Sequence, residues 1–505
     1  MADVFLIGAG PGDPGLLTLR AKEILETADV VVYDYLANPE FLSYCRPEAE
    51  ILYVGKKGSD HTLPQDKINA LIIEKARSGR TVARLKGGDP YVFGRGGEEA
   101  LEIVAAGLTF EVVPGVTAGV AAAAYAGIPV THREFTPSVC FITGHEDPTK
   151  EESAHHWDVY AKSGSTLVFY MGVRNLPDIA GNLIRNGRPK DTPVALIHRG
   201  TTCRQRSLVS TLERVADEAQ AAKFTAPAII VVGGVCALAE KLSWFEKRPL
   251  LGKGVVVTRS REQASDLSKL IRAQGGCVIE FPTIAVEPLD DYDAVEQAIL
   301  TLDSYDWVVF TSVNGVRHFF AKMDEIGLDA RALGGLSVAA IGPATAEVLA
   351  GRGIRPDFVP EKFVAEHVAA GLVELGIAGQ RVLIPRAKEA REVLPEELSR
   401  AGAVVTVLPV YETRLAGGDP ARITEALAAG EIDYVTFASS STVDNFFSLV
   451  GADVLRRHPG VRFACIGPVT AKTLAKHGFS AAIQPEAYTI PALVEALVAD
   501  AAKSR

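Results

Sequence analysis

The stretch that decides the fold reads RLKGGDPYVFGRGGEE and runs from Arg84 to Glu99. The apolar residues 81–83 before it predict the end of a buried strand, and residues 98–104 have the apolar spacing of a helix. Glycines in the turn between them let a ligand approach the backbone closely and leave N–H groups free to bind it. Asp89, among these glycines, can accept hydrogen bonds from a ribose hydroxyl or an amino group. The alternative is a tight strand-to-helix turn that binds nothing.

Two further glycine-rich turns occur on either side of this stretch. Residues 8–15 read GAGPGDPG after a predicted strand at 4–7, and residues 114–118 read PGVTA after another at 110–113. The first turn resembles a dinucleotide fingerprint, but Asp13 stands where the third glycine belongs, which disfavours a nicotinamide or flavin site. Three such turns in one chain favour a ligand site over three empty turns.

Length and composition exclude several classes of protein. A chain of 505 residues is too long for one core and predicts three or four domains. The formal charge of −10 disfavours a nucleic-acid or anionic-membrane binder, although clustered arginines could still bind a small anionic substrate. The six cysteines form no CxxC pair, so we expect small core residues in a reducing compartment, without a disulfide frame or metal site. The sequence shows neither a signal peptide nor an apolar tract of spanning length, and predicts a cytoplasmic protein.

Strands that alternate with helical segments predict an α/β fold for the first half of the chain. Further strands are expected at 28–33, 51–54, 139–143, 166–170, 194–198 and 228–232. The first of these ends at Asp34, at the carboxyl end of a strand, where α/β proteins place their chemistry. We therefore expect one domain at 1–115, a second at 116–245 and a ligand in the cleft between them.

A set of motifs in fixed order resembles uroporphyrinogen-III C-methyltransferase, of the tetrapyrrole methylase class, over residues 3–245. The motifs are GAGPGDP at 8–14, YD at 33–34, GK at 55–56, GGDP at 87–90, FGRG at 93–96, PGVTA at 114–118, THR at 131–133, MG at 171–172 and GT at 200–201. The resemblance departs from the family at Tyr35, where relatives usually carry arginine. It implies the two-domain tetrapyrrole methylase fold, a homodimer formed through this half, and no metal.

The same resemblance implies the roles of individual residues. Contacts to S-adenosylmethionine, as co-substrate, are implied at Pro11, Gly87, Gly88, Asp89, Val92, Thr117, Ala118, Met171 and Gly200. Asp34 would accept a proton and Lys56 would donate one; the alternatives are a helix N-cap for the aspartate and a solvated surface charge for the lysine. The substrate carries eight carboxylates, and its candidate anchors are Arg84, Arg95, His132 and Arg133. Each of these could equally be an exposed charge.

The second half of the chain, after a connector at 246–253, contains an internal repeat. Residues 306–312 match 433–439 at an offset of 127 (433 − 306), and the same offset pairs Pro282 with Pro409. Near the end of each copy IGPATA at 341–346 pairs with IGPVTA at 466–471, with a slip of two residues. Two such copies predict two similar parallel-sheet lobes that face each other across a cleft.

The repeated segment resembles uroporphyrinogen-III synthase over residues 250–502. The resemblance rests on FTSVNGV at 310–316, PVYET at 409–413 and IGPVTA at 466–471. It implies one lobe built from 254–286 and 412–502 and a second lobe at 287–411. Tyr411 would donate the proton that removes the substrate hydroxyl, and Thr311, Ser312, Ser439 and Thr470 would bind substrate carboxylates. The alternatives are an amphipathic tyrosine at a strand end and hydroxyls that only cap helices.

Together the two resemblances predict a bifunctional enzyme of tetrapyrrole synthesis. The second half would cyclise hydroxymethylbilane to uroporphyrinogen III with inversion of ring D. The first half would methylate that product at C2 and C7 with S-adenosylmethionine, which gives precorrin-2 on the way to sirohaem or cobalamin. The alternatives are a methylase that acts on a later corrinoid, and a second half that binds the porphyrinogen without catalysis.

Overall fold

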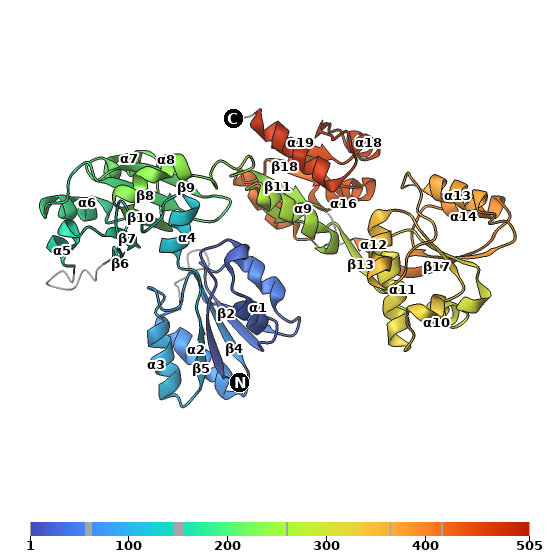
Figure 1. Cartoon of the computed structure of the whole chain (residues 1–505), viewed down its shortest axis with the longest axis horizontal. Coiled ribbons are helices and arrows are strands. Elements are labelled where there is room, and N and C mark those ends of the chain that lie inside the picture. The colour runs from blue at the N-terminus through green and yellow to red at the C-terminus, as the bar shows by residue number, and fades with distance from the viewer. Residues whose placement is uncertain are drawn as a thin grey trace. The chain divides into compact units, whose positions relative to one another are not determined.

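The computed structural model describes residues 2–55, 63–145, 155–258, 261–363, 365–415 and 418–503. The chain forms two compact parts, one of Met1–Gly254 with Leu270–Val278 and Val498–Arg505, the other of Val255–Lys269 and Ile279–Leu497. Four five-stranded sheets flanked by helices confirm the predicted α/β class (Figure 1). Across the described ranges, no helix combines the length and apolar composition that crossing a bilayer requires.

The first sheet is parallel throughout and has the order β3-β2-β4-β1-β5. Its strands are β1 Val4–Gly8, β2 Val30–Tyr33, β3 Glu50–Tyr53, β4 Val82–Lys86 and β5 Phe110–Val113. Side chains of helix α1, Leu19–Leu25, pack on one face, and those of α2, Gln65–Arg77, and α3, Gly96–Ala105, pack on the other. The sheet is therefore covered on both faces, which explains why its strands are almost continuously apolar.

The second sheet, in the order β6-β7-β10-β8-β9, mixes parallel and antiparallel pairs. Its strands are β6 Val139–Thr143, β7 Thr166–Tyr170, β8 Pro193–His198, β9 Arg206–Thr211 and β10 Ala228–Val232. Its helices are α4 Ala118–Tyr125, α5 Trp157–Lys162, α6 Leu176–Arg185, α7 Val215–Ala221 and α8 Ala239–Leu242. The sequence analysis did not predict β9, an edge strand whose polar residues hide the strand pattern.

The third sheet takes strands from both ends of the repeated segment, in the order β12-β11-β18-β19-β20. Its strands are β11 Gly254–Val257, β12 Cys277–Glu280, β18 Tyr434–Phe437, β19 Arg462–Cys465 and β20 Ala481–Ile483. Its helices are α9 Arg261–Ala273, α15 Pro420–Ala428, α16 Ser440–Val450, α17 Ala452–Arg456, α18 Pro468–Lys476 and α19 Ile490–Ala502.

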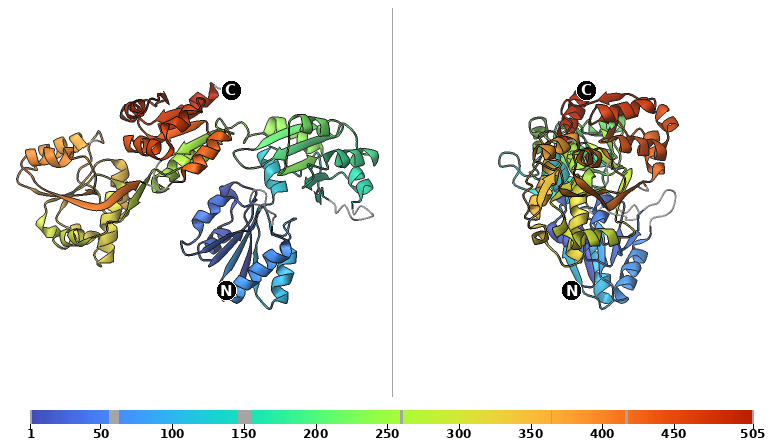
Figure 2. Two further views of the ribbon diagram at one scale, coloured as in Figure 1. Left: turned by 180° about the vertical axis from the view of Figure 1, so that it is seen from behind. Right: turned by 90° about the vertical axis from the view of Figure 1, so that its right-hand side faces the viewer.

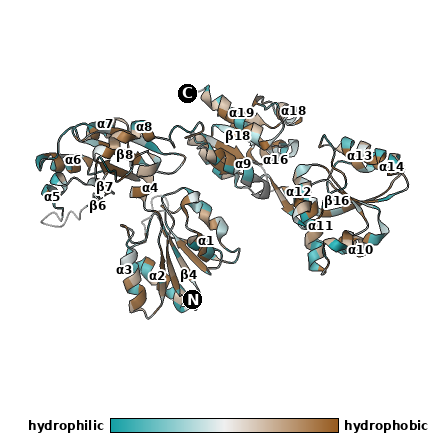
Figure 3. Cartoon of the chain, in the orientation of Figure 1, coloured by the Kyte–Doolittle hydropathy of each residue, from teal (hydrophilic) through white to brown (hydrophobic). Residues whose placement is uncertain are grey.

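The fourth sheet has the order β13-β17-β16-β14-β15, and its edge strand β13 is antiparallel. Its strands are β13 Ile284–Glu287, β14 Trp307–Phe310, β15 Ser337–Ala340, β16 Arg381–Ala387 and the long β17 Val404–Leu415. Its helices are α10 Asp293–Leu300, α11 Val313–Glu325, α12 Pro343–Gly351, α13 Ala365–Glu374 and α14 Val393–Arg400. Brown, the hydrophobic colour, is plain on strands such as β4 and β8 in Figure 3.

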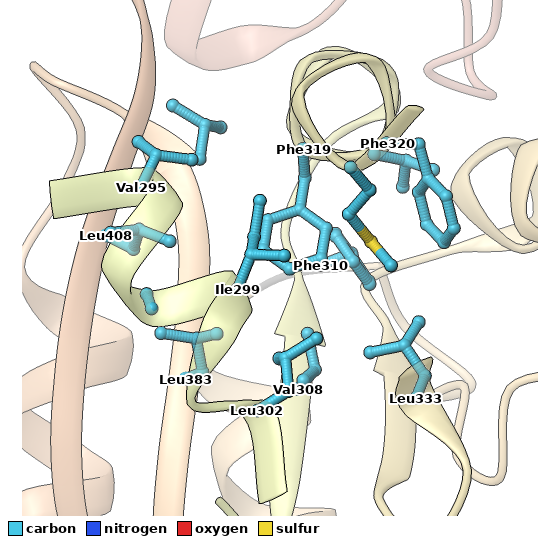
Figure 4. Close-up of a cluster of buried hydrophobic side chains, with 14 of the residues drawn as sticks. Val295, Ile299, Leu302, Val308, Phe310, Phe319, Phe320, Leu333, Leu383 and Leu408 are labelled. Atoms are coloured by element: carbon cyan, nitrogen blue, oxygen red, sulfur yellow. The ribbon is translucent and has the colours of Figure 1, made fainter. Parts of the chain in front are cut away.

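The internal repeat also appears in the cores of the third and fourth sheets. Phe310 packs with Phe319 and Phe320 at centroid distances of 5.6 and 6.3 Å, inside the cluster drawn in Figure 4. Phe437 packs in the same way with Phe446 and Phe447, at 5.5 and 6.3 Å. The predicted repeat therefore reproduces side-chain packing as well as backbone order.

The cysteines do not all behave as expected. Cys203 and Cys277, which are 74 positions apart in the sequence, form a disulfide with a Cα–Cα distance of 5.2 Å. The expectation of no disulfide is wrong for this pair, because sequence spacing does not reveal which distant segments meet. Cys236 and Cys465 are buried as predicted, and burial raises the pKa of each thiol to about 12.

The three glycine-rich turns meet at one edge of the first sheet, the carboxyl ends of β1, β4 and β5. Gly10 and Gly88 exchange backbone hydrogen bonds of 3.1 and 2.7 Å. A Cβ atom on Gly115 would lie 2.3 Å from the carbonyl oxygen of Gly88 and 2.7 Å from Cα of Gly8. The turns thus touch through their backbones, at a distance that leaves no room for side chains.

We predict that Gly115→Ala lowers the stability of this part of the protein by about 1–3 kcal/mol or more, because backbone atoms must move apart. Gly97→Ala in α3 is the matched control, because nothing lies within 4 Å of the added Cβ. This variant should unfold at the same temperature as the wild type or at a slightly higher one. Differential scanning calorimetry of the full chain measures both. Equal midpoints for the two variants would contradict the close approach of the turns.

Candidate active sites

Asp34 lies at the carboxyl end of β2, where its carboxylate is partly exposed. Its Oδ1 accepts a hydrogen bond of 3.1 Å from the backbone N–H of Leu36, and its Oδ2 accepts one of 2.9 Å from Nη2 of Arg84. The side chain is 27% exposed, whereas that of Arg84 is only 3% exposed. The aspartate therefore caps a turn, and a buried guanidinium orients its carboxylate towards an accessible surface. Lys56, its predicted partner, lies outside the described residues.

Asp34 belongs to a group of four charges, in which the other three residues, Arg84, Lys86 and Glu99, are buried. Oε1 of Glu99 accepts hydrogen bonds of 3.4 Å from Arg84, 2.6 Å from Lys86 and 2.9 Å from Gln65. Desolvation, together with repulsion by Arg84, lowers the pKa of the Lys86 ammonium. The two cations and two carboxylates thus neutralise one another's charge at a place where water has little access.

The predicted substrate anchors differ in burial and in their partners. Arg84 is buried under Asp34 and pairs with Asp34 and Glu99, and its role as an anchor of a substrate carboxylate stays a prediction. Arg95 pairs with Glu98 on the surface of α3, where both side chains are more than half exposed. His132 accepts a hydrogen bond of 3.2 Å from the N–H of Glu134, and Arg133 is exposed.

The turn after β4 lies directly against the turn that carries Asp34. A Cβ atom on Gly87 would fall 2.4 Å from Cβ of Leu36, so only glycine fits there. Asp89 accepts hydrogen bonds of 2.8 Å from the N–H of Tyr91 and 3.0 Å from the N–H of Gly115. Its carboxylate therefore fastens the second turn to the third, in addition to any contact with a ligand.

Further predicted donor contacts follow the carboxyl ends of β7 and β8 in the second sheet or lie beside them. Thr117 Oγ1 lies 2.7 Å from Oη of Tyr170, which also accepts a hydrogen bond of 2.8 Å from the N–H of Gly119. Met171 follows with a φ of 56° and is 55% exposed. A Cβ atom on Gly200 would lie 2.3 Å from Cβ of Ala122, so this loop packs on α4. Of the remaining predicted donor contacts, Pro11 lies in the first turn, Val92 packs beside α4, and Ala118 begins that helix.

In the fourth sheet Tyr411 lies beside a change of register. Arg386 pairs with Pro409 and the next residue, Ala387, pairs with Tyr411, so Val410 is an extra residue in β17. Such a bulge re-aims the side chains that follow it. The Tyr411 hydroxyl lies 3.2 Å from Oγ of Ser312 and its ring stacks on His318 at 5.2 Å. The tyrosine is 8% exposed and lies within β17, whereas the alternative interpretation placed it at a strand end.

The predicted hydroxyl residues lie at the starts of helices in both repeats. Ser312 accepts a hydrogen bond of 2.9 Å from the N–H of Gly315 and caps α11, and Ser439 forms a capping box with Thr442 at α16. Thr311 precedes the first cap and is half-buried, while Thr470 in α18 is only 4% exposed. Helix capping is therefore sufficient to explain both serines. The other N–H groups in the first turn of each helix stay available to a ligand.

Sequence analysis missed two exposed aromatic residues near these helix starts. Phe363 is 56% exposed and lies 3.2 Å from the position that a Cβ atom on Gly342 would occupy; Tyr488 is 61% exposed and lies 3.3 Å from that of Gly467. The two glycines belong to the paired IGP turns. The offset that pairs these turns in the sequence also pairs Phe363 with Tyr488, and this signal could have identified the two rings. Among the described residues, no cluster of three His, Cys, Asp or Glu side chains is arranged to hold a metal ion.

We predict that Glu99→Gln lowers the free energy of unfolding by about 3–5 kcal/mol, because Arg84 and Lys86 then share a single carboxylate in a buried place. The adjacent Glu98→Gln is the matched control, since it breaks only the exposed pair with Arg95 and should cost less than about 1 kcal/mol. Urea unfolding measures both variants. A Glu99→Gln variant as stable as the control would show that the buried charges do not depend on one another.

Two family descriptions match the chain in succession. The family described as Tetrapyrrole (Corrin/Porphyrin) Methylases matches residues 3–216, and Uroporphyrinogen-III synthase HemD matches residues 265–495. Uroporphyrinogen-III C-methyltransferase of Bacillus subtilis is 43% identical over 330 residues, 65% of this chain and 68% of that protein. These matches confirm both resemblances that were inferred from the motifs.

Solved structures resemble each half of the chain separately. Uroporphyrin-III C-methyl transferase from Thermus thermophilus, complexed with S-adenyl homocysteine, is 38% identical and covers 46% of this chain and 99% of its own, with a TM-score of 0.41. A mutant uroporphyrinogen III synthase from the same organism is 21% identical and covers 50% of this chain and 100% of its own, with a TM-score of 0.37.

One relative spans both halves. Porphyrin biosynthesis protein HemD of Ruminiclostridium josui is 38% identical over 495 residues, which is 98% of this chain and 97% of that protein. Likeness of this extent, across the methylase region and the synthase region alike, shows that the chain belongs to the family of fused HemD porphyrin biosynthesis proteins.

Proposed function

We propose that the protein converts hydroxymethylbilane to uroporphyrinogen III in its second half and methylates that product at C2 and C7 in its first half, which gives precorrin-2. The observation that carries the methylase assignment is the contact between the turn of Asp34 and the glycine turn of Gly87. This contact supports the assignment of Asp34 as a proton acceptor that lies directly beside the backbone turns proposed to bind the methyl donor.

The donor cradle suits S-adenosylmethionine, which supplies the electrophilic methyl group. Gly8, Gly88 and Gly115 bring three turns together with no side chains between them, so a ligand can lie along their backbone N–H and C=O groups. Gly87, Asp89, Val92, Thr117, Ala118, Met171, Gly200 and Pro11 are assigned to this cradle. The side chains of the cradle are neutral apart from Asp89, which suits positioning more than covalent catalysis.

Asp34 is assigned the acceptance of the proton that the pyrrole carbon loses after it forms its bond to the methyl group. Arg84 keeps the Asp34 carboxylate oriented and compensates its charge, and Oδ1 remains at the accessible side. A positioned carboxylate of this kind contributes about 10²–10⁴-fold to such a step. Lys56 as proton donor, Arg95, His132 and Arg133 as carboxylate anchors, and a homodimer in the cytoplasm stay predictions.

In the second half, Tyr411 is assigned the protonation of the hydroxyl that leaves hydroxymethylbilane as water. Ser312 lies within hydrogen-bond reach of this phenol and can hold it in one orientation. The starts of α11, α12, α16 and α18 supply N–H groups for substrate carboxylates, beside Thr311, Ser312, Ser439 and Thr470. The bounds of the two lobes that would carry these groups, 254–286 with 412–502 and 287–411, stay predictions.

The full protein, incubated with hydroxymethylbilane and S-adenosylmethionine, should yield a tetrapyrrole that carries two added methyl groups, as determined by mass spectrometry. Asp34→Asn should stop at uroporphyrinogen III, with methylation slowed about 100-fold or more. Tyr411→Phe should slow cyclisation by at least about tenfold. It should still methylate uroporphyrinogen III that is supplied directly.

Each variant is thus the control for the other half of the protein. If the wild type methylates a later corrinoid but not uroporphyrinogen III, the methylase assignment is wrong. If hydroxymethylbilane gives only the unrearranged isomer at the uncatalysed rate, the second half is a binding module.

A further inference from the structure

The loop between β8 and β9, residues 199–205, holds an unfavourable backbone conformation beside the donor cradle. Arg199 and Thr201 have φ values of 47° and 69°, in the left-handed region that side chains disfavour. The N–H of Thr201 is buried and donates a hydrogen bond of 2.7 Å to Oε1 of Gln205. Gln205 is itself only 3% exposed, so this side chain is the support of the strained residue.

The amide of Gln205 is held from outside the loop by Glu246. Gln205 Nε2 donates a hydrogen bond of 2.8 Å to Oε1 of Glu246, which also accepts one of 2.5 Å from Ser207. The carboxylate accepts only, so it obliges the amide to present its NH₂ to Glu246 and its oxygen to Thr201. Glu246 belongs to the connector that follows the methylase region, and the sequence indicated no role for it.

The supported loop is in direct contact with the first glycine turn. Thr201 Oγ1 accepts a hydrogen bond of 3.2 Å from the N–H of Asp13, and a Cβ atom on Gly12 would lie 2.7 Å from Thr202. Asp13 accepts a further hydrogen bond of 2.7 Å from Tyr125, whose pKa is raised by burial and by this carboxylate, so the phenol stays a donor.

Trp244, just before the connector, packs on the same elements. The Trp244 ring lies 5.0 Å from that of Tyr125, and its Nε1 donates a hydrogen bond of 3.1 Å to the carbonyl of Ala124. Downstream, the N–H of Gly252 donates one of 2.9 Å to the carbonyl of Cys203. Trp244 is therefore bound to the end of α4, and the connector itself is bound to the loop 199–205.

We propose that Glu246 is a positioning residue for the methyl-donor site, because through Gln205 it holds the loop 199–205 in the conformation that the donor cradle requires. The inference rests on the proposed function, which assigns Gly200 of this loop to donor binding. The connector to the synthase region would then contribute to donor binding by the methylase region.

Calorimetric titration of the reduced, full-length protein with S-adenosylhomocysteine tests this inference. Glu246→Ala should raise the Kd for S-adenosylhomocysteine and the KM for S-adenosylmethionine about tenfold, the size of effect that loss of one charge-assisted hydrogen bond produces. It should leave kcat, the KM for uroporphyrinogen III and the cyclisation of hydroxymethylbilane unchanged. Glu240→Ala, which removes an exposed carboxylate from neighbouring α8, is the matched control and should leave donor binding unchanged.

An exchange of the two side chains tests the pairing itself. Gln205→Glu alone places two carboxylates against each other and should weaken donor binding at least as much as Glu246→Ala. Combined with Glu246→Gln, it restores the chain of hydrogen bonds. The new carboxylate at 205 accepts one hydrogen bond from the N–H of Thr201 and another from the new amide at 246. The double variant should bind S-adenosylhomocysteine within about twofold of the wild type.

The outcomes separate this inference from the proposed function. If the wild type binds neither sulfur compound, the donor site itself is wrong and the inference falls with it. If the wild type binds but Glu246→Ala binds equally well, or the exchange restores nothing, the role of Glu246 alone is overturned. A loss of kcat without a change in Kd would also overturn it.

Discussion

Direct contact between backbone turns is the constraint on which the methylase region depends. Gly8, Gly88 and Gly115 approach so closely that a single Cβ atom would collide with main-chain atoms. This contact requires β1 to lie between β4 and β5, which is the observed strand order. Asp89 then fastens two of the turns through backbone N–H groups. The shape of the cradle is thus set by the sheet, and reactive side chains such as Asp34 are added at its edge.

In the synthase region the two copies of the repeat share the same packing and helix caps, but the proposed catalytic residue occurs in only one copy. The aromatic triads of Phe310 and Phe437 and the paired serine caps repeat almost without change. Tyr411 does not repeat, because the offset of 127 places Ile284 at the matching position (411 − 127). The chemistry proposed for Tyr411 therefore has no counterpart at the matching position of the other lobe. Both lobes are seen in two further orientations in Figure 2.

Much of the fold was predictable because periodicity and turn chemistry are local properties. The strands expected at 4–7, 28–33, 51–54 and 110–113 are observed within one or two residues of those bounds, while β4 runs on to Lys86. The burial of Arg84, the bulge beside Tyr411 and the Cys203–Cys277 pair were not predictable, since each depends on residues that are distant in sequence. The chain of contacts from Glu246 through Gln205 to Thr201 was missed for the same reason.

The disulfide has a consequence for the covalent connectivity of the molecule. Cys203 and Cys277 enclose the whole connector in a closed ring of chain, 74 residues apart in sequence. A protease that cuts once inside this ring leaves the methylase and synthase regions joined through sulfur. Two fragments would then separate on a denaturing gel only after a thiol reductant is added, whereas a cut outside the ring would release a piece at once.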